Sequence, residues 1–546
     1  MSINILLAFV FTLLILGCAD KKETDVLDGR TNILLIVADD MGWTDLGCFG
    51  SEISTPNIDK IARHGIRFTD FHTSVSCSPT RSMLLSGTDN HLAGLGNMKE
   101  LLTPEQKGKP GYEGHLTKQV ASLPEVLKDG GYHTYMAGKW HLGNELGTIP
   151  GARGFERSFS LLFGGASHYS DRTGLQESTN PAEYSLDKQK INELPKDFYS
   201  SKNYTDFVID AIRENKDDDQ PFFAYLAFTA PHDPLHVPEP WLSMYKGKYD
   251  IGYEELRKSR IEKSKKLNLT PAGANVPRLH PDIKPWNSLT KEERAFESKK
   301  MEVYAGMVAN LDYHVGRLIN FLMDIGEFEN TVIIFLSDNG PNPWYSTEYP
   351  GNADGVFLSQ FDNRIENIGN PTSHISYAIG WASACAGPHD YFKMTVGEGG
   401  IRSPLIIAGP GIQENKINAS FAYVTDLMPT ILELTEVEHP DKYNGIDLHP
   451  MTGRAMKDIL SGRTDFTYAP DEYIGGEMLN GKWMRKGDFK AVFVTKPYGP
   501  NEWKLYDLAT DPGETRDLSE EMPDLLKELI NEWDNYVKDV GVVLLE

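Results

Sequence analysis

The 546-residue sequence has little cysteine, little positive charge and no internal repeat. Its four cysteines are Cys18, Cys48, Cys77 and Cys385, too few for a disulfide scaffold, although whether Cys48 and Cys385 pair stays open. The 54 Lys and Arg residues are outnumbered by 78 Asp and Glu, which gives a formal net charge of −24. Proteins that bind nucleic acid or acidic membranes carry basic surfaces, so this balance argues against both classes.

Long apolar runs are also scarce, and residues 3–17 form a nearly uncharged run that is shorter than the roughly 20 residues of a membrane span. The run has the length of a signal peptide and ends in Ile15-Leu16-Gly17-Cys18, which resembles a bacterial lipobox. Met1-Ser2-Ile3-Asn4 lacks the usual basic residue, but no polar face marks the run as a buried helix. We therefore expect a signal peptide over 1–17, a tether over 18–30 that is lipidated at Cys18, and an exported bacterial lipoprotein. Such a protein would be held in the periplasm or cell envelope by its lipid alone.

Apolar segments of strand and helix type alternate along the next 400 or so residues, which is typical of α/β proteins. Residues 32–38 form a continuous apolar run, as in a strand buried on both faces. Further strands are expected at 66–71, 132–137, 222–228, 331–336 and 404–408. Helices are expected between Thr55 and Gly65 and at 123–128, 204–213, 301–323 and 423–437. Residues 31–438 therefore predict one large, mostly parallel sheet covered by helices on both faces.

Two long segments interrupt this alternation of strands and helices, and a different pattern follows it after residue 438. Residues 246–294 are rich in charge and predict a solvated helical excursion without chemistry. Residues 341–389 are rich in Asn, Gly, Pro and aromatics, and a loop of that length usually has a function, here the shaping of a substrate pocket. Pro440 favours a boundary near His439. Short strands and an amphipathic helix beyond it predict an α+β subdomain over 439–546.

Cys77-Ser78-Pro79-Thr80-Arg81 precedes an apolar helical run that starts at Met83. Pro79 suits a first helical position, which would leave Cys77 on the preceding loop. The start of a helix favours an anion, and the guanidinium of Arg81 suits a tetrahedral oxyanion. Alone, the pattern also fits a buried structural cysteine beside a surface arginine, so the rest of the chain must decide.

Polar residues follow several expected strands directly. They are Asp39-Asp40, Lys139-Trp140-His141, Pro231-His232 and Ser337-Asp338-Asn339-Gly340. The carboxyl ends of parallel strands form the crevice where open α/β sheets bind ligands. Adjacent carboxylates repel each other unless a cation lies between them, and oxygen donors of this kind suit Ca²⁺ or Mg²⁺.

In this order the motifs resemble those of the type I sulfatases, closest to bacterial arylsulfatases of the alkaline phosphatase-like superfamily. The matching segments are Cys77 to Arg81, Gly138 to His141, Pro231-His232, Ser337 to Gly340, and Lys393 ahead of Gly399-Gly400-Ile401-Arg402. The resemblance extends from Asn32 to the Leu505 to Pro512 segment. It implies an alkaline phosphatase-like fold and the hydrolysis of sulfate monoesters at the S–O bond.

The resemblance also implies roles for single residues. Cys77 would be oxidised by a formylglycine-generating, sulfatase-maturating enzyme, and the aldehyde hydrate would attack sulfur and later release the sulfate. Asp39, Asp40, Asp338, Asn339 and residue 77 would hold Ca²⁺, with Mg²⁺ as the alternative. Arg81, Lys139 and Lys393 would neutralise sulfate, His232 would protonate the leaving oxygen, and His141 would partner the hydrate. Asp338 could help to deprotonate the attacking hydroxyl, and His236 and Arg402 are assigned to packing or the pocket wall.

Other functions remain open at this point. An exo-acting carbohydrate sulfatase would use the same chemistry, and a phosphonate or phosphate ester hydrolase would share the fold. A non-catalytic lipoprotein that binds sulfated ligands would leave Cys77 unmodified. Aromatic residues in the 341–389 loop favour small aryl sulfates or chain-end sulfated sugars as substrates; they are Trp344, Tyr345, Tyr349, Phe357, Phe361, Tyr377 and Trp381.

Overall fold

The computed structural model describes residues 30–545, so the expected signal peptide and the lipidation of Cys18 lie outside the described residues. Within residues 30–545, no helix has the length and apolar character needed to cross a bilayer.

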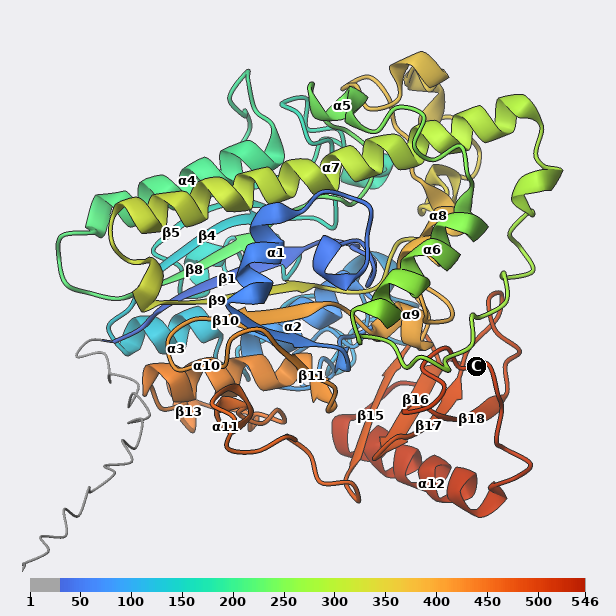
Figure 1. Ribbon diagram of the computed structural model, residues 1–546. Coiled ribbons are helices and arrows are strands. Elements are labelled where there is room, and N and C mark those ends of the chain that lie inside the picture. The colour runs from blue at the N-terminus through green and yellow to red at the C-terminus, as the bar shows by residue number, and fades with distance from the viewer. Residues whose placement is uncertain (1–29, 546) are drawn as a thin grey trace, which may run out of the picture.

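A ten-stranded sheet runs through the centre of the molecule (Figure 1). In spatial order its strands are β11 (Lys416–Asn418), β2 (Gly65–Phe68), β10 (Leu405–Ala408), β9 (Thr331–Ser337), β1 (Asn32–Ala38), β8 (Phe222–Ala227), β4 (His133–Lys139), β5 (Arg157–Leu161), β6 (Tyr184–Leu186) and β7 (Gln189–Ile191). The strands from β9 to β5 are mutually parallel, as expected. Antiparallel pairs occur nearer both edges, so the sheet is mixed.

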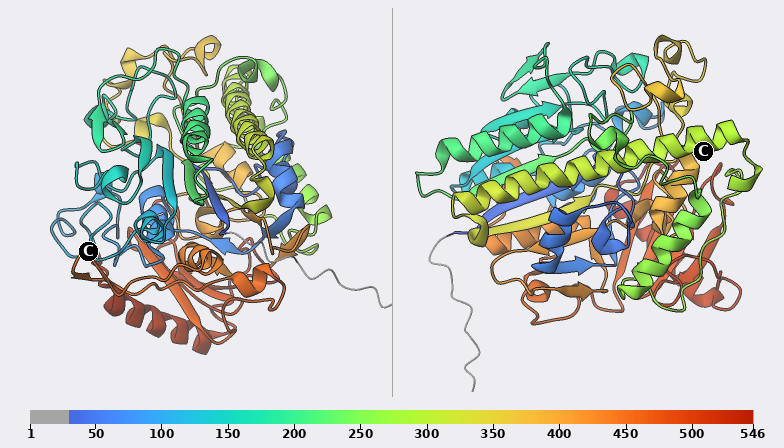
Figure 2. Two further views of the ribbon diagram at one scale, coloured as in Figure 1. Left: turned by 90° about the vertical axis from the view of Figure 1, so that its left-hand side faces the viewer. Right: turned by 45° about the horizontal axis from the view of Figure 1, so that its top comes forward.

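Helices cover both faces of the sheet, and strand β1 shows why (Figure 2). Its side chains alternate: Leu34 and Ile36 join one apolar core, and Leu35 and Val37 join the other. The first core is closed by α1 (Pro56–Arg63), α4 (Ser200–Asn215) and α7 (Lys291–Asp324). The second is closed by α2 (Cys77–Ser86), α3 (Leu123–Asp129) and α10 (Leu427–Thr435). Full burial of one large aliphatic side chain stabilises the folded state by about 1.5–3 kcal/mol. Because β1 has such side chains on both faces, a helix layer is needed on each face of the sheet.

Helix α7 is longer than the sequence predicts, because it begins ten residues before Met301, at Lys291. A capping box fixes this start: the Thr290 hydroxyl accepts from the Glu293 N–H, and the Glu293 carboxylate accepts from the Thr290 N–H. The charged 246–294 excursion is also less solvated than expected. Its helix α6 (Tyr253–Lys266) buries Arg260 completely against Asp45 and Glu52.

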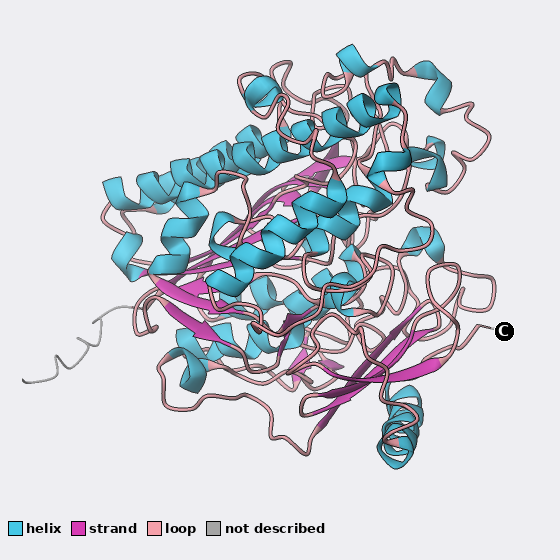
Figure 3. Ribbon diagram, turned by 45° about the vertical axis from the view of Figure 1, so that its right-hand side comes forward, coloured by secondary structure: helices cyan, strands magenta, loops and turns pink. Residues whose placement is uncertain are grey.

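The end of the chain forms a separate antiparallel sheet with a helix across it (Figure 3). Its elements are β15 (Tyr473–Met478), β16 (Gly481–Lys486), β17 (Phe489–Phe493), β18 (Trp503–Asp507) and α12 (Pro523–Val540). Leu529 and Trp533 of α12 pack on this sheet. The segment before it still packs on the large sheet, where α11 (Lys457–Leu460) joins the α10 core. The boundary near His439 stays a prediction.

Short elements complete the described residues. The strands are β3 (Phe71–His72), β12 (Ala422–Tyr423), β13 (Lys442–Tyr443) and β14 (Ile446–Asp447), and the helices are α5 (Trp241–Met244), α8 (Ala378–Ala386) and α9 (Glu398–Ile401).

A buried histidine joins the terminal sheet to the main body and predicts a pH-dependent stability. His91 lies between Asp89, 3.0 Å from Nδ1, and Glu477 of β15, 3.1 Å from Nε2. Burial lowers the pKa of His91, but its two carboxylate partners outweigh burial and raise it from 6.5 to about 9. The folded state binds the His91 proton more tightly than the unfolded state does, so protonation of His91 stabilises the fold. This stabilisation is complete below pH 6.5 and is lost as the pH rises through 9.

We expect about 3 kcal/mol of unfolding free energy to disappear over this range. Urea denaturation from about pH 6 to about pH 10 measures it. The variant His91→Gln should be less stable at low pH and lack this slope. An equal slope in both proteins would contradict the assignment.

Candidate active site

The carboxyl ends of β1, β4, β8 and β9 deliver the predicted residues to one crevice. Asp39 and Asp40 follow β1, Lys139 ends β4, and Asp338 follows β9. Their side chains are all fully or nearly fully buried. The pairing of β1 with β9 explains why the carboxylates meet. Ala38 pairs with Ser337, so the next residues, Asp39 and Asp338, lie side by side at the ends of the two strands.

Cys77 is the first residue of α2, and not a loop residue ahead of it as the sequence analysis expected. The Thr80 N–H donates to the Ser76 carbonyl, so the helix starts two residues before Pro79. Pro79 is tolerated there because the first turn has no intrahelical acceptor for its missing N–H. The buried side chains from Met83 to Leu85 anchor the helix as predicted, and Cys77 faces the ends of the strands.

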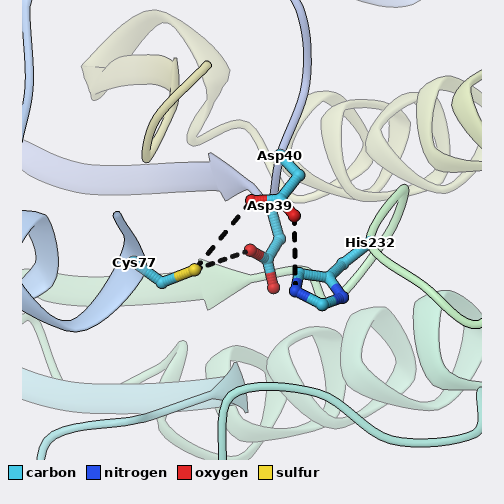
Figure 4. Close-up of side chains that lie close together, drawn as sticks. All are labelled: Asp39, Asp40, Cys77 and His232. Carbon is cyan, nitrogen blue, oxygen red and sulfur yellow. Dashed lines mark hydrogen bonds and ion pairs between the residues drawn. The ribbon is translucent and has the colours of Figure 1, made fainter. Parts of the chain in front are cut away.

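The Cys77 thiol lies beside the two aspartates (Figure 4). Its Sγ is 3.5 Å from Asp39 Oδ1 and 3.9 Å from Asp40 Oδ1, and His232 Nε2 is 3.3 Å from Asp40 Oδ2. Burial raises the pKa of the thiol to about 12. The thiol therefore stays protonated at neutral pH and is a poor nucleophile as it stands.

Three buried cations neutralise the three carboxylates. Lys139 Nζ is 2.7 Å from Asp39 Oδ2, and Lys393 Nζ is 2.9 Å from Asp40 Oδ2. Arg81 donates to Asp338 Oδ2 from Nε at 2.9 Å and from its terminal nitrogen at 2.8 Å. Buried charges are tolerated when they are paired and hydrogen-bonded in this way. Arg81 thus secures Asp338, whereas Lys393 also reaches Cys77 Sγ at 3.3 Å.

The oxygen atoms of the crevice fit a hard divalent cation. Burial, together with the neighbouring charge of Asp338, raises the pKa of Asp39 to about 8 against the opposing effect of Lys139. Asn339 donates to Asp40 Oδ1 at 2.6 Å, while its own Oδ1 is buried without a hydrogen-bond partner among the described residues. Buried amide oxygens are rarely left unpaired, and carbonyl and carboxylate oxygens are the ligands that Ca²⁺ and Mg²⁺ prefer.

Backbone strain also occurs at the site. Asp40 and His141 have φ values of 64° and 57°, and Tyr391 and Met394, on either side of Lys393, have 65° and 69°. A side chain with a Cβ rarely adopts this left-handed region, and such residues persist where the surroundings fix them, often at active sites. Two residues of the sequence motifs, Asp40 and His141, are therefore held in this conformation by their surroundings.

Comparison with known proteins agrees with this geometry. The family model described as Sulfatase matches residues 31–437, and the one described as N-sulphoglucosamine sulphohydrolase, C-terminal, matches residues 387–539. The chain belongs to the sulfatase family. Its large sheet and terminal sheet are those of an alkaline phosphatase-like sulfatase, and it is an enzyme that hydrolyses sulfate esters.

Individual relatives of this sulfatase span most of its length. It is 44% identical over 526 residues to an uncharacterized sulfatase of Schizosaccharomyces pombe, with 94% of each chain covered. It is 40% identical over 434 residues to the arylsulfatase of Klebsiella aerogenes, covering 79% of this chain and 92% of the relative. The solved structure of Ps i-CgsB in complex with k-i-k-neocarrahexaose has a TM-score of 0.65 at 22% identity, covering 93% and 92% of the two chains. At that identity the likeness shows the fold alone.

Most of the predicted site residues of this sulfatase meet in one contact network, although their catalytic roles stay predictions. His141 is the exception, because its hydrogen bond joins Nε2 to Glu100, 3.3 Å away. His236 binds the Ser373 carbonyl and Arg402 pairs with Asp70, so both are packing residues. Cys48 and Cys385 are free thiols, which answers the open question of their pairing.

The sequence analysis missed several residues around the cavity beside Cys77. Glu100 lies in a short loop helix that carries no motif. Gly164 and Gly165 pack against the histidines: a Cβ on Gly164 would lie 2.9 Å from His141 Cε1, and one on Gly165 3.1 Å from His232 Nδ1. A glycine pair soon after a strand was a signal that could have been used. Of the aromatics in the 341–389 loop, Trp344 and Tyr349 line this cavity.

A lysine of the terminal sheet holds the segment that carries Lys393, and its removal should be costly. Lys490 Nζ donates to the Val396 carbonyl at 2.8 Å, to Glu398 at 2.7 Å and to Glu514 at 2.9 Å. The variant Lys490→Met would remove the cation between two buried carboxylates, although Glu398 would keep its contacts with His72 and Arg402. We expect a loss of about 3 kcal/mol in unfolding free energy, measured by urea denaturation.

Lys504→Met is the matched control, because Lys504 is part-exposed on β18 and pairs with Asp517 near the surface at 3.3 Å. Exposed pairs contribute at most about 1 kcal/mol. Equal effects of the two substitutions would show that the Lys490 contacts do not hold this segment.

Proposed function

We propose that this sulfatase acts on small sulfate monoesters of phenols and apolar alcohols, with chain-end sulfated sugars as the alternative. The observation that carries this is the cavity beside Cys77, whose wall is mostly apolar. The apolar side chains that line it are Met98, Leu101, Phe163, Leu175, Trp344 and Pro350. Such a wall binds an aryl or alkyl group well but offers few partners for sugar hydroxyls.

We propose that residue 77 provides the nucleophile after its conversion to formylglycine by a maturating enzyme. The hydrated aldehyde then supplies a hydroxyl that attacks sulfur, which the protonated thiol cannot do. Asp39, whose Oδ1 is 3.5 Å from Cys77 Sγ, is a second candidate beside Asp338 to take the hydroxyl proton. Asp338, which the sequence analysis expected to help deprotonate the attacking hydroxyl, also accepts hydrogen bonds from Arg81.

His232 is the proposed proton donor to the leaving oxygen. Its Nδ1 bonds the Asp233 carbonyl at 2.9 Å, which must be the acceptor, so Nδ1 carries a proton. Nε2 therefore faces the site and lies 3.5 Å from Lys393 Nζ. Burial lowers the pKa of His232, and the charge of a bound sulfate ester would raise it again.

Ca²⁺ is the proposed ion, with Mg²⁺ as the alternative, held by Asp39, Asp40, Asp338, Asn339 and residue 77. A bound ion would polarise the sulfate oxygens. The oxygen donors and the unpaired Asn339 Oδ1 support this choice.

Export and anchoring through Cys18 remain a proposal that rests on the apolar run and the lipobox-like sequence. Labelling cells with a radioactive fatty acid tests it. The full chain should incorporate label into the envelope fraction and the variant Cys18→Ser should not. Equal labelling of both would contradict it.

A substrate screen tests the proposed function. The matured enzyme is assayed on aryl sulfates, sulfated monosaccharides and intact sulfated polysaccharides, with released sulfate quantified. Phenyl phosphonate is included because a phosphonate monoester hydrolase of Agrobacterium radiobacter shares the fold, with a TM-score of 0.55 at 18% identity. We expect aryl sulfates to react fastest. Rapid desulfation within long polymers, without activity on small esters, would contradict the proposal.

A further inference from the structure

One acidic side chain breaks the apolar wall of the cavity beside Cys77. Among the described residues that line this cavity, Glu100 is the one carboxylate. It lies on the short helix Lys99–Leu101, between the apolar lining residues Met98 and Leu101. Its side chain is 23% exposed, so the carboxylate is only partly covered by neighbouring side chains.

Glu100 also fixes the orientation of a site histidine. Its Oε2 is 3.3 Å from Nε2 of His141, whose side chain is 7% exposed. A carboxylate can only accept here, so Nε2 carries a proton. Burial lowers the pKa of His141, which favours the neutral ring with its lone pair on Nδ1. Nδ1 is buried without a partner among the described residues. Burial raises the pKa of Glu100, but its contact with His141 outweighs this and lowers it to about 2, so Glu100 is ionised at neutral pH.

We propose that Glu100 is a specificity-determining residue that selects uncharged leaving groups while it positions His141. A carboxylate in a cavity of low dielectric strongly repels a second anion a few ångströms away. Lys139 and Lys393 attract any anion to the site. Discrimination between anionic substrates therefore needs a side chain that repels the unwanted ones. Esters whose alcohol carries a carboxylate or a second sulfate, such as uronates or polysulfated sugars, are the substrates excluded. This inference rests on the proposed aryl sulfate activity.

Two esters that differ in charge, and otherwise by one methyl group, test the charge effect. Methyl para-sulfooxybenzoate has a neutral leaving group, and para-sulfooxybenzoate has an anionic one. We expect the matured wild-type enzyme to prefer the neutral ester by roughly tenfold to a hundredfold in kcat/KM. The variant Glu100→Gln should bring this ratio to within about threefold of that for the uncatalysed esters. Because both esters are measured on one enzyme, a general loss of turnover cancels in the ratio.

Two further variants separate charge, hydrogen bonding and general effects. Glu177→Gln removes an exposed carboxylate near the cavity but outside its wall, and should keep the wild-type ratio. Glu100→Leu removes both the charge and the acceptor for His141. It should lower kcat for the neutral ester and alter its pH profile, and Glu100→Gln should restore much of both. Thermal melting verifies that each variant is folded.

The outcomes are distinguishable. An unchanged ratio in folded Glu100→Gln, or the same change in Glu177→Gln, would overturn the inference while leaving aryl sulfate hydrolysis intact. Equal turnover of the two esters by the wild-type enzyme would do the same. Hydrolysis of neither ester by fully matured enzyme would overturn the proposed substrate class and this inference with it.

Discussion

Replacing Cys77 with alanine is expected to lower kcat for aryl sulfate hydrolysis by about four orders of magnitude or more, because it removes the precursor of the nucleophile. Cys77 Sγ lies within 4 Å of Asp39, Asp40 and Lys393, and the described residues offer no other thiol in the crevice. Released sulfate, measured on protein produced together with a maturating enzyme, gives the effect.

Cys48→Ala is the matched control, since Cys48 is a free, part-buried thiol that does not line the cavity and whose N–H bonds Asp59 of α1. It should keep nearly full activity. A Cys77→Ala enzyme within tenfold of the wild type would exclude residue 77 as the nucleophile.

The second large effect is expected for Asp40→Asn, which should lose bound metal and most activity together. Asp40 accepts from Lys393 and Asn339 and lies 3.3 Å from His232, so it links the cationic groups to the proposed ligand set. The substitution replaces an anionic ligand oxygen by an amide, and divalent cations depend on the charge of their ligands. We expect activity to fall by roughly a thousandfold, as is common when a transition-state charge loses its stabilisation. Elemental analysis of the dialysed protein measures the metal.

Asp45→Asn provides the comparison, because Asp45 is also a buried carboxylate but is bound by Arg260 at 2.5 Å and by Tyr304 at 2.6 Å. It should lower stability and leave metal occupancy unchanged. Full occupancy in Asp40→Asn, or equal metal loss in both variants, would refute the ligand assignment.

The parallel centre of the sheet and the crevice could be predicted because their signals are local. The unbroken apolar run from Asn32 to Ala38 identifies a strand buried on both faces, and Asp39 and Asp40 must then lie at its carboxyl end. The same reasoning placed Lys139 and Asp338 at the ends of β4 and β9. Parallel pairing aligns these ends, so residues far apart in sequence meet without any further information.

The rest depends on contacts between distant segments. The expected role of Arg81 at the sulfate stays a prediction, and its hydrogen bonds to Asp338 could not be read from the motif because Asp338 lies 257 residues away. Glu100 could not be identified because its function depends on His141, 41 residues away. The aromatics of the 341–389 loop diverge for the same reason: Trp344 lines the cavity, whereas Trp381 packs in the core. The aromatic content of the loop does not tell which aromatic side chains line the cavity and which pack in the core.

The central claim is that residue 77 acts as formylglycine in sulfate ester hydrolysis. The most direct test correlates two quantities in protein samples matured to different extents: the fraction of Cys77 converted, from peptide mass spectrometry, and the initial rate of sulfate release from para-nitrophenyl sulfate. We predict a rate that is proportional to the converted fraction and close to zero for the unconverted protein. Full activity in protein whose Cys77 is an unmodified thiol, or no sulfate release by fully converted protein, would contradict the account.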